Sequence, residues 1–260
     1  MIGGNAMTRR LKNLLLSINY ENRKIHRTDN NKKGRRLVVF GDSFFQHSTG
    51  KIHNIPNQGL SWTGLLADNL NMSLLNYANS GTSLNYSVQM LFHYMETEYD
   101  ENDTIIFGVT NASRVTNLLD DESQGWHSTA WKFIDPDFEL SSIPKEQCKY
   151  FKKDKEFWQT YLTRCMYADD VKNQFSLVQT YLNTMKNDVL VLHSFSDLFD
   201  GDEFNLMQIV RRENLKYFEK LNHMSDTNKK LLARQAMKYF INIGQNKRSP
   251  FDINRYTIEK

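Results

Sequence analysis

The chain has 260 residues, of which 40% are hydrophobic and 12% aromatic, enough to bury the core of one large domain with decorations. Its 33 basic and 30 acidic side chains leave a net charge of only +3, which argues against a general nucleic-acid-binding surface. The two cysteines cannot build a disulfide framework, and their spacing does not suit a metal site, so we expect no metal and no cofactor. No apolar run reaches the ~20 residues of a membrane helix, so we expect no membrane span.

The first 35 residues are strongly basic. The stretch "RRLKNLLLSI" can form a short amphipathic helix, and "RTDNNKKGRR" has the composition of a linker. Leu14–Leu16 is too short for the apolar region of a signal peptide, so no secretory leader is expected. We predict an N-terminal arm over residues 1–35 that is either solvated or docked on a partner or an acidic surface.

After the arm, short apolar runs alternate with helical patterns. Runs rich in β-branched residues predict buried strands over 36–40, 73–78, 104–109 and 188–195. Helical periodicity is found over 61–71, 84–99 and 155–186. Strands that alternate with helices predict an α/β fold with a parallel sheet covered on both faces, whose functional residues lie at the carboxyl ends of the strands.

The segment 119–153 fits neither the helical nor the strand period and contains two tryptophans and two prolines. Long irregular segments in compact domains are often lids or binding loops, so we expect an insertion over one end of the sheet. The predicted domain therefore spans 36–245 with this insertion, and a tail follows over 246–260.

Four polar or glycine residues follow the strands in chain order. Ser43 lies in a Gly-Asp-Ser turn, Gly81 in the loop after the second strand, and Asn111 after the third. His223 comes shortly before a late helical pattern, with Ser225 as its expected N-cap. Acyl transfer needs a hydroxyl nucleophile, an imidazole that accepts its proton, and donors for the developing oxyanion. The sequence Gly-Asp-Ser is also common in turns that have no catalytic function. The prediction of a catalytic site therefore depends on all four positions together.

These segments, "FGDSF", "ANSG", "VTNA" and "HMSDTNKKLLA", resemble the four blocks of the SGNH, or GDSL-type, hydrolase superfamily over residues 36 to about 240. Within it, the chain is most similar to SGNH-like proteins of large tailed bacteriophages. The resemblance implies a flavodoxin-like three-layer α/β/α fold and hydrolysis of carboxylic esters, often O-acetyl groups on a glycan. It also implies Ser43 as nucleophile and His223 as general base, with an oxyanion hole made by the amides of Ser43 and Gly81 and the side chain of Asn111. Because no signal peptide is seen, we expect a cytoplasmic or virion-associated protein.

Two positions depart from the family pattern. Val109 stands where the family usually has glycine, although the adjacent Gly108 could loosen the same turn. Lys220 stands three residues before His223, where the family has the aspartate that orients the imidazole. Asp226 is expected to serve the N-terminus of the late helix instead. The alternative function is therefore a catalytically degenerate binding or virion-associated module.

Other residues keep two interpretations. His193 ends the fourth predicted strand and is the second candidate for the base, whereas His47 and His53 are expected to be solvated loop residues. Arg114 could contact an anionic substrate or pair with a surface carboxylate, and Trp126 could bind a sugar or pack in the fold.

The helix predicted over 155–186 could cover the core or mediate homo-oligomerisation.

Overall fold

The computed structural model describes residues 25–28, 34–47, 61–79, 82–110, 114–117, 126–129, 166–195, 204–213, 224–243 and 251–256, with only the backbone for 114–117, 126–129 and 166–170. Most of the predicted arm, insertion and tail lies outside these ranges. So do Gly81, Asn111, Lys220 and His223.

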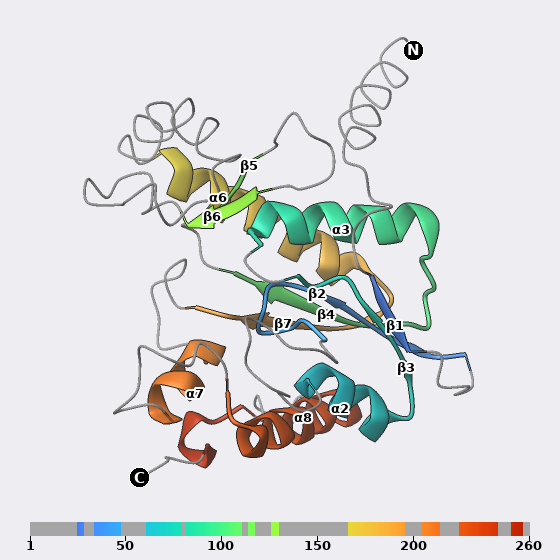
Figure 1. Ribbon diagram of the computed structural model, residues 1–260. Coiled ribbons are helices and arrows are strands. Elements are labelled where there is room, and N and C mark those ends of the chain that lie inside the picture. Colours follow the sequence, from blue (N-terminus) through green and yellow to red (C-terminus); the bar gives the residue numbers. More distant parts are fainter. Residues whose placement is uncertain are drawn as a thin grey trace.

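A five-stranded sheet in the order β1-β3-β2-β4-β7 forms the centre of the described part (Figure 1). Its strands are β1 (His26–Thr28), β2 (Arg36–Phe40), β3 (Ser73–Asn76), β4 (Thr104–Val109) and β7 (Asp188–His193). β2 pairs in parallel with both β3 and β4, and β4 pairs in parallel with β7. The four predicted strands are confirmed, with two of them ending two residues earlier than expected.

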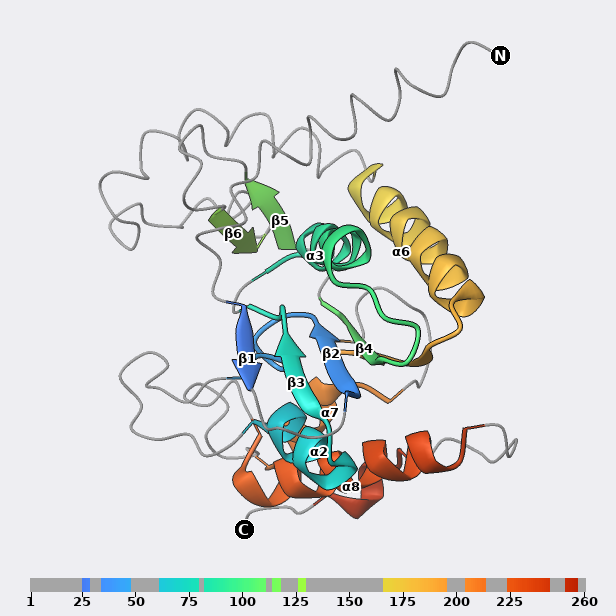
Figure 2. The ribbon, with the colours of Figure 1, turned by 90° about the vertical axis from the view of Figure 1, so that its right-hand side faces the viewer.

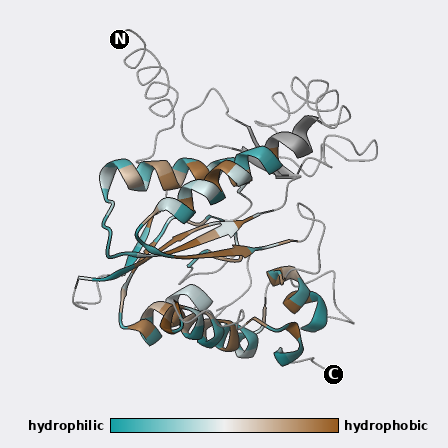
Figure 3. Cartoon of the chain, turned by 180° about the vertical axis from the view of Figure 1, so that it is seen from behind, coloured by the Kyte–Doolittle hydropathy of each residue, from teal (hydrophilic) through white to brown (hydrophobic). Residues whose placement is uncertain are grey.

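Helices cover both faces of this sheet (Figures 1 and 2). One face packs against α3 (Leu84–Thr97) and α6 (Met166–Thr184), and the other against α2 (Trp62–Leu70), α7 (Leu206–Glu213) and α8 (Asp226–Ile241). Along β2, Leu37 and Val39 join the α2/α8 cluster while Val38 and Phe40 join the α3/α6 cluster, because successive side chains of a strand point to opposite faces. The strands are accordingly among the most hydrophobic parts of the chain (Figure 3).

Three strands were not predicted from the sequence. Residues 26–28, which were expected to belong to the arm, form β1, the antiparallel edge strand, with His26 opposite Asn76. Within and beside the expected insertion, β5 (Arg114–Asn117) and β6 (Trp126–Thr129) pair antiparallel as a separate two-stranded sheet. The sequence pattern did not predict these strands, because three or four residues are too few to show the two-residue period of a strand.

The helix boundaries follow local capping signals. Ser225 caps α8 as predicted, since its hydroxyl accepts a hydrogen bond from the Asn228 amide, and α8 begins at Asp226. The structure describes a helix over 166–184 of the predicted 155–186. α7 was not predicted, although its buried Leu206, Ile209 and Val210 have helical spacing.

Candidate functional site

The turn after β2 places Ser43 at the carboxyl edge of the sheet. Gly41 has φ 145°, a conformation that side-chain-bearing residues rarely adopt, and it redirects the chain where β2 ends. The Asp42 carbonyl then accepts hydrogen bonds from the amides of Phe45 and Gln46, which closes the turn around a partly exposed Ser43. Neither the amide nor the hydroxyl of Ser43 has a hydrogen-bond partner among the described residues.

The fully buried carboxylate of Asp42 joins three strand ends. It accepts hydrogen bonds from the Phe44 amide at 3.0 Å, from Thr110 Oγ1 after β4 at 2.7 Å, and from Ser194 Oγ after β7 at 2.9 Å. Hydrogen bonds to an ionised acceptor are stronger than neutral ones. The residue before Ser43 therefore fixes the Ser43 turn against the residues that follow β4 and β7, a function that the sequence analysis missed.

The carbonyl groups of the same turn are held by α2 and β3. Trp62 Nε1 donates to the Phe44 carbonyl at 2.7 Å, and Asn76 Nδ2 donates to the Phe45 carbonyl at 2.9 Å. Asn76 Oδ1 in turn accepts from the Ala78 amide at 3.0 Å, so the end of β3 is fixed as well. Buried backbone groups need such partners, and here the partners also determine where Ser43 lies.

The loop that contains Gly81 is bound to this turn on both sides of the glycine. The Gly41 carbonyl accepts from the Asn79 amide at 3.1 Å and lies 3.2 Å from Thr82 Oγ1. Thr82 is fully buried. Gly81 itself lies outside the described residues, but it is separated from Thr82 by one peptide bond.

Asn111 also lies outside the described residues, and its neighbour Thr110 is the one bonded to Asp42. Gly108 does not loosen a turn here, which corrects the sequence expectation, because it is a buried residue within β4. A Cβ added to Gly108 would lie 2.4 Å from Phe45 Cε2, so the missing side chain makes room for the Phe45 ring. Phe45 also packs edge-on against Trp62.

We expect Gly108→Ala to destabilise the fold and the Ser43 turn together. The new methyl group would overlap the Phe45 ring, and overpacking of this kind costs about 1–3 kcal/mol. Urea denaturation of the variant measures the change in the free energy of unfolding. Gly34→Ala is the control for a glycine replacement without a clash. Gly34 lies at an exposed loop position with nothing within 4 Å of the new Cβ, and its positive φ adds some strain. An unchanged stability of Gly108→Ala would show that the ring does not depend on this space.

His223 lies outside the described residues, but the residues that follow it are held by burial and by hydrogen bonds. Met224 is buried in the α2/α8 core, and the buried Glu213 carboxylate at the end of α7 accepts from the Ser225 amide at 2.8 Å and also from the side chains of Ser225 and Asn228. A carboxylate is favoured at a helix N-terminus. Glu213 therefore holds Ser225, the N-cap of α8, two residues after the predicted base. In the sequence, the one sign of this role is the helical spacing of Glu213 from Ile209 and Val210.

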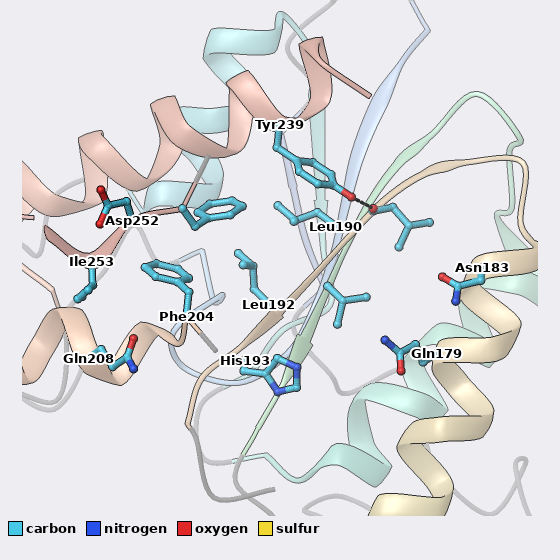
Figure 4. A pocket seen from close by; sticks show the side chains of 13 residues that line it. Gln179, Asn183, Leu190, Leu192, His193, Phe204, Gln208, Tyr239, Asp252 and Ile253 are labelled. Carbon is cyan, nitrogen blue, oxygen red and sulfur yellow. Dashed lines mark hydrogen bonds between the residues drawn. The ribbon is translucent and has the colours of Figure 1, made fainter. Parts of the chain in front are cut away.

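His193, the second candidate for the base, ends β7 as predicted. Its ring packs edge-on against Phe175 of α6 with centroids 5.5 Å apart, and it lines a groove beside β7 (Figure 4). The next residue, Ser194, bonds to Asp42. Because adjacent strand residues point to opposite faces, the His193 ring lies on the α6 face of the sheet.

His47 is not a solvated loop residue, and that prediction is wrong. It is 7% exposed, its Nδ1 lies 2.7 Å from Ser61 Oγ, and its ring centroid lies 4.2 Å from that of His26 in β1. Burial, followed by the nearby His26, lowers the pKa of His47 to about 4, and burial lowers the pKa of His26 as well. This neutral pair packs β1 against the segment that follows Ser43.

We expect this burial to make the protein less stable in acid. The folded-state pKa of His47 is below that of an unfolded chain, so the stabilisation is complete above pH ~6.5 and is lost as the pH falls toward 4. The loss is on the order of 2 kcal/mol, measured as the free energy of unfolding in urea at pH 7 and pH 4.5.

His47→Asn should reduce this pH dependence, because the amide can still bond to Ser61 but does not titrate. His93→Gln, a histidine on α3, is the control and should keep it. Equal pH dependence in the wild type and His47→Asn would contradict the assignment.

Arg114 and Trp126 are placed by their backbones alone. Arg114 begins β5 opposite Thr129, and Trp126 begins β6 opposite Asn117, at the two ends of the short ladder. Among the described residues no three His, Cys, Asp or Glu side chains gather as metal ligands. No helix in the described ranges is long and apolar enough to cross a membrane.

No family model and no curated protein matches the chain. A matching solved structure is that of a protein from Desulfitobacterium hafniense DCB-2 assigned to the G-D-S-L family of lipolytic proteins. The two chains are 15% identical with a TM-score of 0.34, and the match covers 78% of this chain and 98% of that chain.

Proposed function

We propose that the protein is a serine ester hydrolase of the SGNH type, with a three-layer α/β/α fold and Ser43 as its nucleophile. The observation that carries this proposal is the set of hydrogen bonds around Ser43. Asp42 binds the residue before Asn111, and Gly41 binds residues on both sides of the Gly81 position. Three of the four segments that the resemblance requires are thus tied to one turn.

In the proposed reaction, Ser43 Oγ attacks the ester carbonyl carbon while His223 takes the hydroxyl proton. The negative charge that develops on the carbonyl oxygen is stabilised by the amides of Ser43 and Gly81 and by the Asn111 side chain. The Ser43 amide suits this function, because it donates to no other group in the described part of the chain. His223 then gives its proton to the leaving alcohol, and water hydrolyses the acyl-enzyme.

The substrate class that we propose is a carboxylic ester, with O-acetyl groups on a glycan as the first candidates from the sequence resemblance. Arg114 and Trp126 would contact the substrate, since β5 starts three residues after Asn111. The reaction needs no metal or cofactor.

A fluorophosphonate probe tests the proposal without knowledge of the substrate, because it reacts with a serine that a neighbouring base activates. We expect the folded wild type to be labelled on Ser43, as identified by mass spectrometry of the labelled peptide. Protein unfolded in urea is the control and should not react. Absence of label on the folded protein, or label on another serine, would contradict the assignment of Ser43.

Lys220 favours a second candidate function, a pocket that binds but does not react. The carboxylate partner in a serine hydrolase fixes the tautomer of the histidine and stabilises its protonated form, and its loss can cost ~10⁴-fold in kcat. We therefore expect weak wild-type activity on short p-nitrophenyl esters, and we expect Lys220→Asp to raise kcat by about ten-fold or more.

Lys220→Ala is the matched control, because it removes the cation without adding an acceptor for the imidazole. If the Asp and Ala variants were equally inactive and His223→Ala did not change the activity, the site would not be catalytic. The protein would then be a binding module and not a hydrolase.

A further inference from the structure

At the outer edge of β7, the backbone groups of Val191 and the amide of Val189 bond to no other described residue. The Ser194 amide donates to the Val109 carbonyl, so Leu190, Leu192 and Ser194 direct their amides toward β4. The alternate residues Val189 and Val191, and His193, therefore direct their N–H and C=O groups away from the sheet. Such an edge is a template for another strand.

Parts of this edge are already occupied by the chain itself. Tyr239 of α8 donates its hydroxyl to the Val189 carbonyl at 3.1 Å (Figure 4). Asn205 forms a parallel bridge with His193. Among the described residues nothing bonds to the outward amide and carbonyl of Val191 or to the amide of Val189. The free part of the edge is short and lies between Tyr239 and Asn205.

A groove of about 850 Å³ runs along this edge and has two chemically different walls (Figure 4). The α6 wall carries the exposed amide side chains of Gln179 and Asn183, which bond to no described residue. The opposite wall is mainly apolar and aromatic, with Phe204, Tyr239, Phe251 and Ile253, and it also carries the amide of Gln208. The described lining has no lysine or arginine, and its one acidic residue, Asp252, caps the helical turn η3 (Ile253–Arg255).

We propose that this groove binds an extended peptide segment of another protein, which adds to the free edge of β7. In such a segment, successive side chains point to opposite sides, so one set would face the amides of α6 and the other the aromatic wall. The matching sequence alternates uncharged polar residues with apolar ones. Acidic residues are disfavoured, because the groove offers them no cation.

The structure argues against a second copy of this chain as the occupant. Edge-to-edge pairing of two β7 strands about a two-fold axis centred on Val191 would place Val189 of one copy opposite His193 of the other. Asn205 already occupies the strand position beside His193. A peptide that ends before it reaches His193 avoids this overlap, whereas a β7 strand that continues past His193 does not.

The test uses a fluorescein-labelled octapeptide with blocked ends, in which threonine alternates with valine or phenylalanine. We expect it to bind the full chain, as measured by fluorescence anisotropy, and to slow hydrogen exchange of the Val191 amide. The same residues arranged as one polar and one apolar block, and the alternating peptide N-methylated on alternate backbone nitrogens, should each bind at least about ten-fold more weakly.

A matched pair of variants on α6 tests the location. Gln179→Lys places a charge over the free edge and should weaken binding at least about ten-fold, because charged side chains block edge pairing. Leu177→Lys places the same charge about 200° around the helix at a residue that is 73% exposed, and should leave binding unchanged.

Equal binding of the alternating and block peptides, equal loss in both variants, or an unprotected Val191 amide would overturn the proposal. A concentration-dependent dimer that Gln179→Lys alone dissociates would also overturn it, and would make a second copy the occupant. None of these outcomes depends on ester hydrolysis, so the proposal stands or fails independently of the proposed function.

Discussion

Replacing Ser43 with alanine should abolish ester hydrolysis and leave the fold intact. Loss of the nucleophile removes the acyl-enzyme route, so kcat/KM for p-nitrophenyl acetate should fall to the uncatalysed background, on the order of 10⁴-fold or more in an efficient site. Where Lys220 keeps the wild-type rate low, the measurable fall is smaller. The thermal midpoint should stay within about 1 °C of wild type, because the Ser43 side chain is partly exposed and makes no hydrogen bond to a described residue.

Ser61→Ala is the control for the removal of a hydroxyl group. Ser61 binds His47 and caps α2, so its loss should lower the thermal midpoint while the folded fraction keeps its activity. If Ser43→Ala retained wild-type turnover, Ser43 would not be the nucleophile. If it lost activity only together with a large fall in the thermal midpoint, its function would be structural.

Asp42→Ala should give the largest loss of stability among the substitutions considered. It removes the acceptor of three hydrogen bonds, two of which come from the buried hydroxyls of Thr110 and Ser194. We expect the free energy of unfolding in urea to fall by about 3–5 kcal/mol. Activity should fall as well, because a displacement of about 1 Å at a reacting group can cost 10²-fold in rate.

Three milder variants separate the contributions of the single bonds. Thr110→Val and Ser194→Ala should each cost about 1–2 kcal/mol, and their double variant should depart from additivity because both donors share one carboxylate. Asp42→Asn keeps the shape and can exchange donor for acceptor with a hydroxyl, so it should be less harmful than Asp42→Ala. If Asp42→Ala were as stable as wild type, the carboxylate would not hold the three strand ends together.

Some features of this protein follow from residues close together in the chain. The four parallel strands were predicted because each is a continuous apolar run, and such runs belong to strands buried on both faces. Ser225 was predicted as the N-cap of α8 because capping uses an amide only three residues away. The turn at Gly41 was also readable, since a glycine after an apolar run allows the backbone to change direction.

The tertiary structure decided what depends on contacts between distant residues. Asp42 meets Thr110, 68 residues later, and Ser194, 152 residues later, and neither partner can be identified from the sequence around Asp42. The same reason explains the error at His47. Its loop position suggested exposure, but a three-residue edge strand and the start of α2 bury it.

The carboxyl edge of the sheet and the outer edge of β7 also combine features that the sequence predicted with features that only the packing determined. That polar residues would gather at the carboxyl ends of parallel strands followed from the order of strands and helices. The bonds that form at the outer edge of β7 depend on where α6, α8 and Asn205 pack beside it. The same packing leaves the outward amide and carbonyl of Val191 without a bond to any described residue. Local sequence determines the helices, caps and turns because their hydrogen bonds close within a few residues, and it indicates the strands through their apolar runs. Strand neighbours and side-chain partners are determined only when the elements pack.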